Sequence, residues 1–393
     1  MIPLVMAGAA AIDYARYALA RSELQTALDA ALLSAARLPT STADATVQAL
    51  AENELDKRIN ASWMTNSHID TFRRAAGSTT ATATAQVPMT MMRIAGFETM
   101  PVTASSQVSV ATGKLEIALV LDNSGSMAGS RLNNLVKATN SLLNILESNV
   151  IHTGDVKVSI VPFDRVVKAS KSYQGSAWLD LSRVTSQECD NYRNCHSVVD
   201  WDGCIIDRNQ DYDTTDDSYR SAKYPAADCP DGRGASENLA TMQPMTTDFS
   251  TLRTKANSMV AAGNTNITIG VAWGHAMLSP SGPIAGAVAY GTENLQKIIV
   301  LMTDGENTAN RWYDNDRYSS HADEINARTE LACTDAKNDG IVVYVVNFID
   351  GDSTLLRGCA TNDNYFYKVS SVSDLNEAFI NIGDDISKLR LSK

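Results

Sequence analysis

The stretch Leu115-Glu116-Ile117-Ala118-Leu119-Val120-Leu121, followed by Asp122-Asn123-Ser124-Gly125-Ser126, decides the fold of this chain. The apolar run predicts a strand buried on both faces, which is typical of a parallel sheet covered by helices. Ligands of such sheets bind beyond the carboxyl ends of the strands. Asp122, Ser124 and Ser126 therefore direct one carboxylate and two hydroxyls at one spot, and oxygen ligands of this kind suit a hard divalent cation such as Mg²⁺.

A second apolar run, Lys297 to Thr303, also ends in an acid, because Asp304 follows it directly. A third loop, Gly263-Asn264-Thr265-Asn266-Ile267, leads into a helix-like segment that ends at Leu278. Residues of the Asp-Asn-Ser-Gly-Ser type are also common in ordinary turns. The prediction of a cation site therefore depends on the three loops occurring together in one chain.

The D-x-S-x-S pattern resembles the metal-ion-dependent adhesion site of von Willebrand factor A (VWA) domains. Thr265-Asn266 resembles the threonine loop of that family, and Asp304 its second metal aspartate. The resemblance implies Mg²⁺ as the cation, with Mn²⁺ or Ca²⁺ as alternatives, and an acidic residue of a protein partner as the bound group. It implies metal ligands at Asp122, Ser124, Ser126, Thr265 and Asp304, with Thr268 as a rival for the threonine role.

Composition narrows the function further. The 393 residues have room for two or three domains, and a net charge of −12 argues against nucleic-acid binding, which needs a basic face. The sequence has no G-x-S-x-G, no H-E-x-x-H and no glycine-rich phosphate loop before a helix. Glu306 is the one acid beside the predicted metal loops that would serve as a general base. We therefore expect a protein that is not an enzyme.

The first 38 residues predict one long helix that ends before Pro39. Its apolar start, Ile2 to Ile12, stops at Asp13, well short of the roughly 20 residues that span a bilayer. Residues 12–17 and 24–31 resemble the N-terminal region of TadG-like, Flp-pilus-associated bacterial proteins, whose pilin-like helix begins in the inner membrane. The short apolar start indicates a chain cut within a membrane segment, or a true start that lies upstream. The alternative to a pilin-like helix is a plain amphipathic core helix.

Residues 39–113 are predicted to form a small α+β module. A helix is expected over 44–59, and threonine–alanine alternation over 79–85 indicates a strand. A strand-rich segment is expected over 89–110, with a hairpin turn at 95–98. Gly113 and Lys114 form the expected junction to the next domain.

Residues 114–393 are predicted to form an α/β domain of the VWA, Rossmann-like type, because strands and helices alternate. Strands are expected at 115–121, 156–162, 297–303 and 341–348. Helices are expected at 130–149, 249–261, 267–278, 320–338 and 372–387. The segments Val158–Phe163 and Ala272–Pro280 also resemble TadG-like proteins.

A polar, cysteine-rich insertion occupies residues 169–248, and its cysteines favour disulfides because none has C-x-x-C spacing. Cys333 and Cys359 flank one strand-and-turn unit and are expected to form one disulfide. For the other four cysteines, Cys189–Cys195 with Cys204–Cys229 is the simplest of three pairings. Disulfides indicate an oxidising compartment. A zinc site of Cys189, Cys195, His196 and Cys204 is the rival interpretation.

Within the insertion, Asp207, Asn209, Asp211 and Asp213 alternate like the start of a calcium loop. The EF-hand pattern breaks at Tyr212 and Ser218, where glycine and glutamate belong, so a solvated acidic loop is the alternative. His275 lies downstream of the threonine loop, and a packing role is expected for it.

Together these observations predict a metal-dependent, adhesion-type protein-binding module on a membrane-proximal stalk. By resemblance it acts in Flp/Tad pilus assembly or surface attachment, with pilus or secretion-system components as partners. The expected location is the bacterial cell envelope, with the N-terminal helix in the inner membrane and the rest periplasmic or extracellular. The alternative is a structural pilus or envelope subunit in which the metal only stabilises loops.

Overall fold

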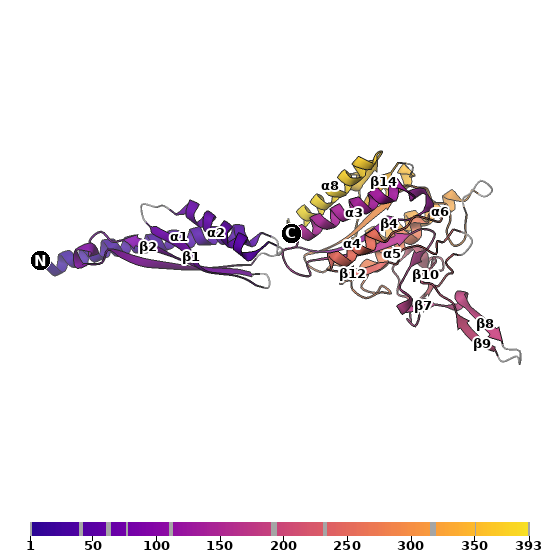
Figure 1. The fold of residues 1–393 in the computed structure, drawn as a ribbon, viewed down its shortest axis with the longest axis horizontal. Helices are drawn as coiled ribbons and strands as arrows, with labels where there is room; N and C mark the ends of the chain where they lie inside the picture. Colours follow the sequence, from indigo (N-terminus) through magenta and orange to yellow (C-terminus); the bar gives the residue numbers. More distant parts are fainter. Residues whose placement is uncertain are drawn as a thin grey trace. The chain divides into compact units, whose positions relative to one another are not determined.

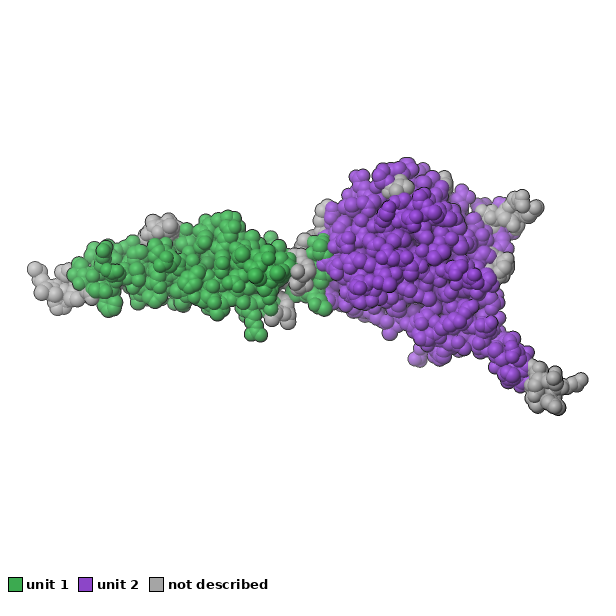
Figure 2. All heavy atoms as spheres, viewed as in Figure 1, with its two compact units in different colours: residues 1–112, 148–153 green, residues 113–147, 154–393 purple. Residues whose placement is uncertain are grey.

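The computed structural model describes residues 2–38, 42–59, 64–75, 78–109, 113–189, 195–230, 234–314, 320–349 and 351–391. The chain forms two compact units (Figure 2). Unit 1 comprises residues 1–112 and 148–153, and unit 2 comprises residues 113–147 and 154–393.

Unit 1 packs helices α1 (Ile2–Ala36) and α2 (Asp44–Arg58) with a three-stranded antiparallel sheet. The strands, in spatial order, are β1 (Thr65–Ala75), β2 (Ser78–Pro88) and β3 (Thr99–Ser109). In β2 the alanines and Val87 face the core and the threonines alternate with them, as the sequence pattern predicts. One core joins α1, α2 and the sheet, so the predicted first helix and the predicted small module share a single hydrophobic centre.

Asp13 explains why the hairpin differs from its prediction. Its buried carboxylate accepts hydrogen bonds from the backbone N–H groups of Thr90, Met91 and Met92, at 3.0, 2.9 and 2.7 Å. These N–H groups are not free to join a strand ladder, and the short helix η1 (Met92–Ala95) forms instead. The expectation of strand from residue 89 onward is therefore wrong for 89–94, whereas the chain turns at 95–98 as predicted and β3 begins at Thr99.

No helix in the described ranges, α1 included, has the combined length and hydropathy that crossing a bilayer requires. The truncated membrane segment therefore stays a prediction.

Unit 2 is built on a sheet with the strand order β10-β6-β5-β4-β13-β14-β15 (Figure 1). Its centre is parallel and consists of β4 (Lys114–Asp122), β5 (Val156–Phe163), β13 (Leu295–Thr303), β14 (Val342–Phe348) and β15 (Phe366–Val369). Three short strands pair antiparallel at one side: β6 (Val167–Lys168), β10 (Cys204–Ile205) and β12 (Gln243–Thr246). The predicted α/β fold with a parallel-sheet core is confirmed.

Helices cover both faces of this sheet. They are α3 (Ser130–Ser148), α4 (Phe249–Asn257), α5 (Ile267–Leu278), α6 (Ala322–Asn338), α7 (Ser353–Cys359) and α8 (Val372–Leu391). Figure 1 shows α3 and α8 together on one side of β4, and α5 on the other. Glycine permits the close approach of α5, because a Cβ at Gly274 would lie 2.5 Å from Val120 Cγ2. This packing holds the start of α5 beside the carboxyl ends of β4 and β5.

The insertion is ordered by an aromatic cluster and by disulfides. Trp178 and Tyr224 of the insertion pack on Trp273 of α5, with ring centroids 6.1 and 4.8 Å away. It contains short strands β7 (Leu179–Asp180) and β11 (Tyr224–Pro225), and a hairpin of β8 (Thr185–Cys189) and β9 (Cys195–Val199) that extends away from the sheet (Figure 1). The irregular loop predicted from its composition is thus a packed subdomain.

Disulfides join Cys204 to Cys229 and Cys333 to Cys359. Cys195 is also disulfide-bonded, and Cys189 lies opposite it in the β8–β9 ladder. The rival zinc site is wrong, because the disulfide removes the Cys204 thiolate that it needs.

Candidate metal site

Asp122 ends β4 and anchors the first of three loops at the carboxyl edge of the sheet. Its carboxylate is fully buried and accepts hydrogen bonds from the Ser124 backbone N–H to Oδ1 (2.7 Å) and from Thr303 Oγ1 to Oδ2 (2.5 Å). Burial raises the pKa of Asp122 to about 6, against the lowering effect of these hydrogen bonds, and the Asp304 charge raises it further. The carboxylate is thus held rigidly by its neighbours and lies close to a second acid.

Asp304 comes to the same place because β13 runs parallel to β4 and in register with it, with Met302 opposite Leu121. Ser126 Oγ donates a hydrogen bond to Asp304 Oδ1 at 2.7 Å and lies 3.0 Å from Ser124 Oγ. The two hydroxyls of the first loop and the carboxylate of the β13 loop therefore form one continuous cluster of oxygens.

Thr265 completes the cluster from the loop before α5. Gly125 N–H donates to Gly263 O at 2.9 Å, which joins the first loop to the threonine loop. A Cβ built on Gly305 would be 3.5 Å from both Ser126 Oγ and Thr265 Oγ1, so both hydroxyls lie close to the same glycine. Thr268 Oγ1 instead lies 2.8 Å from Thr329 Oγ1 of α6, in a buried pair within the helix layer. The local geometry favours Thr265.

Arg131, at the start of α3, is a cationic neighbour that the sequence did not reveal. Its Nη1 donates to Asp304 Oδ2 at 2.5 Å, and its side chain is 29% exposed. The guanidinium thus lies at a carboxylate that a cation would also use, which fits a site with an affinity for positive charge.

Asp164, directly after β5, is a third buried carboxylate that sequence reasoning missed. It accepts backbone N–H groups of Val166 and Ser236, each at 2.8 Å, and thereby ties the insertion to the edge of the sheet. Burial raises its pKa to about 7, with a further contribution from the charge of Asp122. The signal was present in the sequence, because Asp164 follows an apolar strand just as Asp122 and Asp304 do.

The predicted calcium-loop residues accept hydrogen bonds from side chains of other segments. Asp207 is buried against the Asn266 side-chain amide, at 3.0 Å from both carboxylate oxygens, and burial raises its pKa to about 6. Asn209 accepts from Arg311, and both Asp211 and Asp213 accept from Arg328. Calcium binding here stays a prediction, and it would require Arg328 to move away.

His275 lies in the last turn of α5, away from the threonine loop that precedes the helix. There it is surrounded by Asp216, Asp335 and Asp339. The residues predicted for the metal site thus converge, and His275 belongs to a different cluster.

Comparison with known proteins finds one family match, at the N-terminus, and several similar solved structures. Residues 1–38 match the family described as "Putative Flp pilus-assembly TadE/G-like". No curated protein matches the chain. Similar solved structures include the vWF domain of the type V pili tip protein Mfa5 from Porphyromonas gingivalis, with 13% identity, a TM-score of 0.42, and coverage of 71% of this chain and 97% of that one.

Two further structures are similar at the same level. The pilus adhesin SpaC from Lactobacillus rhamnosus GG has 13% identity and a TM-score of 0.43, over 82% of this chain and 33% of that one. Proximal thread matrix protein 1 from the mussel byssus, with a zinc-occupied MIDAS motif, has 14% identity and a TM-score of 0.38, over 70% of this chain and 46% of that one. This chain thus spans less than half of either protein.

Proposed function

We propose that unit 2 binds a divalent cation, Mg²⁺ in the first place, and through it an acidic residue of a protein partner. The proposal rests on one observation: three loops that are far apart in sequence bring two buried carboxylates and three hydroxyls together. Hard oxygen donors of this kind are what Mg²⁺ prefers, and they lack the sulfur and imidazole ligands that favour softer metals. The ligands would be Asp122, Ser124, Ser126, Thr265 and Asp304.

The residues around the cluster fix its geometry in advance. Thr303 and the Ser124 N–H hold the two oxygens of Asp122, so this carboxylate loses little freedom when a cation binds. A bound cation supplies an electrophilic position for an oxygen of the partner's Asp or Glu. Such a contact is short and charge-assisted, so one partner carboxylate contributes a large share of the interface energy.

The match of residues 1–38 to a pilus-assembly family supports a role in Flp/Tad pilus assembly or surface attachment. The disulfides support an oxidising compartment, so we place unit 2 in the periplasm or outside the cell. In this proposal the N-terminal helix contacts the inner membrane, the partners are pilus or secretion-system components, and the role is binding, not catalysis.

Calorimetric titration of the purified chain with Mn²⁺ tests the site. Asp122→Ala and Asp304→Ala should each abolish the binding heat while circular dichroism stays unchanged, and Asp363→Ala, at an exposed acid paired with Arg357, is the matched control. Undiminished heats in both site variants would refute the ligand assignment.

A structural role is the second candidate, and the Arg131–Asp304–Ser126 chain of contacts supports it, because it links α3 and two loops without a cation. Recovery of partners from an envelope extract, with and without EDTA and with Asp122→Ala, separates the two. Loss of the same partner under both treatments favours metal-dependent binding, and equal recovery favours the structural subunit.

A further inference from the structure

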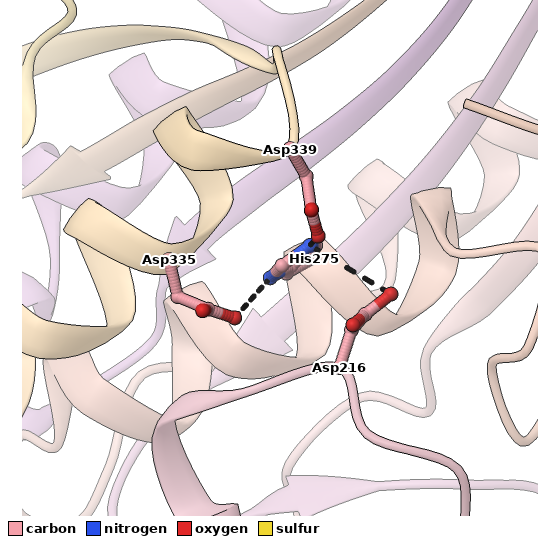
Figure 3. Close-up of side chains that lie close together, drawn as sticks. All are labelled: Asp216, His275, Asp335 and Asp339. Carbon is pink, nitrogen blue, oxygen red and sulfur yellow. Dashed lines mark hydrogen bonds and ion pairs between the residues drawn. The ribbon is translucent and has the colours of Figure 1, made fainter. Parts of the chain in front are cut away.

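A second cluster of ligand-type side chains lies around His275, at the end of α5 (Figure 3). Asp216 comes from the insertion, and Asp335 and Asp339 come from the end of α6 and the residue after it. One ligand atom from each of the four residues lies within 4.8 Å of the others. The cluster thus joins three segments that are separate in the sequence.

The orientation of the imidazole divides the cluster into two sides. Nε2 faces Asp339 Oδ2 at 2.9 Å and Asp216 Oδ2 at 3.9 Å. Nδ1 faces Asp335 Oδ2 at 3.6 Å and has no hydrogen-bond partner, although the side chain is only 1% exposed. Figure 3 shows Asp335 on one side of the ring, with Asp216 and Asp339 on the other. A buried polar atom without a partner is unusual, and Asp335 Oδ2 is the carboxylate oxygen that faces it.

The charges in the cluster do not balance. Within the described residues, no Lys or Arg forms an ion pair with Asp216, Asp335 or Asp339. Three carboxylates around one imidazole carry excess negative charge that a bound cation would neutralise.

We propose that His275 Nε2, Asp216 and Asp339 bind a divalent transition-metal ion of the Zn²⁺ class, and that in the ion-bound state Nδ1–H donates a hydrogen bond to Asp335, which orients the ring. Ligands of tetrahedral zinc at about 2.0–2.2 Å lie roughly 3.3 Å from one another, and the two Nε2–oxygen distances lie on either side of that value. A metal-bound histidine usually donates its other ring N–H to a carboxylate, a backbone carbonyl or water. Tyr290 holds another of the proposed ligands in place, because its hydroxyl donates a hydrogen bond to Asp216 Oδ2 at 2.9 Å.

Solvent reaches the cluster, because the side chains of Asp216, Asp335 and Asp339 are 20, 34 and 35% exposed. A cavity of about 510 Å³ lies beside it and is lined by Tyr290, Lys297 and Asp339 among others. Leu295, the first residue of β13, lines the same cavity, so the cluster lies at the amino end of the sheet. The oxygens around Asp122 lie at the carboxyl end. This second ion would fasten the insertion to α5 and α6, and it does not depend on the function proposed for the Asp122 site.

The test uses untagged full-length protein that carries Asp122→Ala and Asp304→Ala, so that only the second site contributes. Titration with Zn²⁺ against a chromophoric chelator should show one equivalent bound, and near-saturating Zn²⁺ should raise the Tm by about 5–10 °C. No described cysteine is free to compete for the ion. Adding Asp339→Asn should remove both effects, and Asp363→Asn should leave them unchanged.

Asp335→Asn tests the orienting role separately, because it keeps the three ligands and should weaken Zn²⁺ binding about 10- to 100-fold. The proposal is overturned if the background protein binds no Zn²⁺, or if Asp339→Asn and Asp216→Asn bind it as tightly as the background does. If Zn²⁺ has no effect and His275→Gln alone changes the pH dependence of the Tm, His275 is a buried ion-pair partner and the metal assignment is wrong.

Discussion

Arg131 provides a sharp test of the proposed cation site. Its guanidinium donates to Asp304 Oδ2 at 2.5 Å, while Ser126 occupies Oδ1. A cation that uses Asp304 must compete with this ion pair, so part of its binding free energy is spent in displacing Arg131. We therefore predict that Arg131→Gln tightens Mn²⁺ and Mg²⁺ binding.

The size of the effect follows from the burial of the pair. A hydrogen bond to a charged group contributes about 1.5–3 kcal/mol. Asp304 is fully buried but the Arg131 side chain is 29% exposed. When the guanidinium leaves Asp304, water solvates it, and this solvation offsets part of the lost hydrogen-bond energy. Displacing Arg131 therefore costs a cation about 1–2 kcal/mol of binding free energy. Removing this cost by Arg131→Gln should raise the cation affinity roughly 5- to 30-fold.

Calorimetric titration of Arg131→Gln with Mn²⁺, beside the parent chain, measures this gain. Arg357→Gln is the matched control. It also removes one positive charge, but from α7 and from an exposed ion pair with Asp363. An affinity that is unchanged, or lower than in the parent chain, would show that Arg131 does not compete with a cation at Asp304.

Three further predictions address the same framework. Burial raises the pKa of Asp122 to about 6, and a cation needs the ionised carboxylate. Mn²⁺ affinity should therefore fall up to about tenfold per pH unit below pH 6, and binding should release protons. An Mn²⁺ affinity that calorimetry finds unchanged from pH 5 to 7 would contradict this. Thr265→Ala should weaken Mn²⁺ binding and Thr268→Ala should leave it intact, whereas the reverse result would transfer the ligand role to Thr268. Replacing Cys333 and Cys359 by Ala should lower the free energy of unfolding by about 3.5 kcal/mol, as expected for a separation of 26 residues, and an unchanged urea midpoint would exclude this contribution.

The sequence predicted the parallel core well because its signals are local. Long apolar runs mark β4 and β13, and an acid directly after each run marks the carboxyl edge where ligands gather. Strand β1 was missed because Thr65–Ala75 carries charged and polar residues that give no clear alternation. The sequence of β1 has no strand pattern of its own, and β1 is held in the sheet by antiparallel pairing with β2. The shift of β3 to Thr99 depended on Asp13, which is more than 70 residues away.

The parts of the site that escaped prediction are contacts between segments. Arg131 pairs with an acid 173 positions away, and the cluster around His275 forms only because the insertion folds back onto α5 and α6. A sequence motif reveals a functional residue only when nearby positions in the sequence carry related side chains. His275 has apolar neighbours on both sides, so no motif marks it. Its apolar setting correctly predicted burial, and burial beside three carboxylates is also what makes the imidazole a plausible ligand.

The buried acids at the carboxyl edge have a common physical consequence. Asp122, Asp164 and Asp207 all have their pKa raised by burial, and the charge of Asp122 raises the pKa of Asp164 further. A protein that needed only stability would gain from replacing such groups with apolar residues, since desolvated charge is costly. Carboxylates held in this way retain a strong preference for a positive partner, and a divalent cation satisfies it better than the guanidinium of Arg131 because it bonds several oxygens at once. The strain of keeping these acids buried is therefore consistent with a site selected for binding a cation.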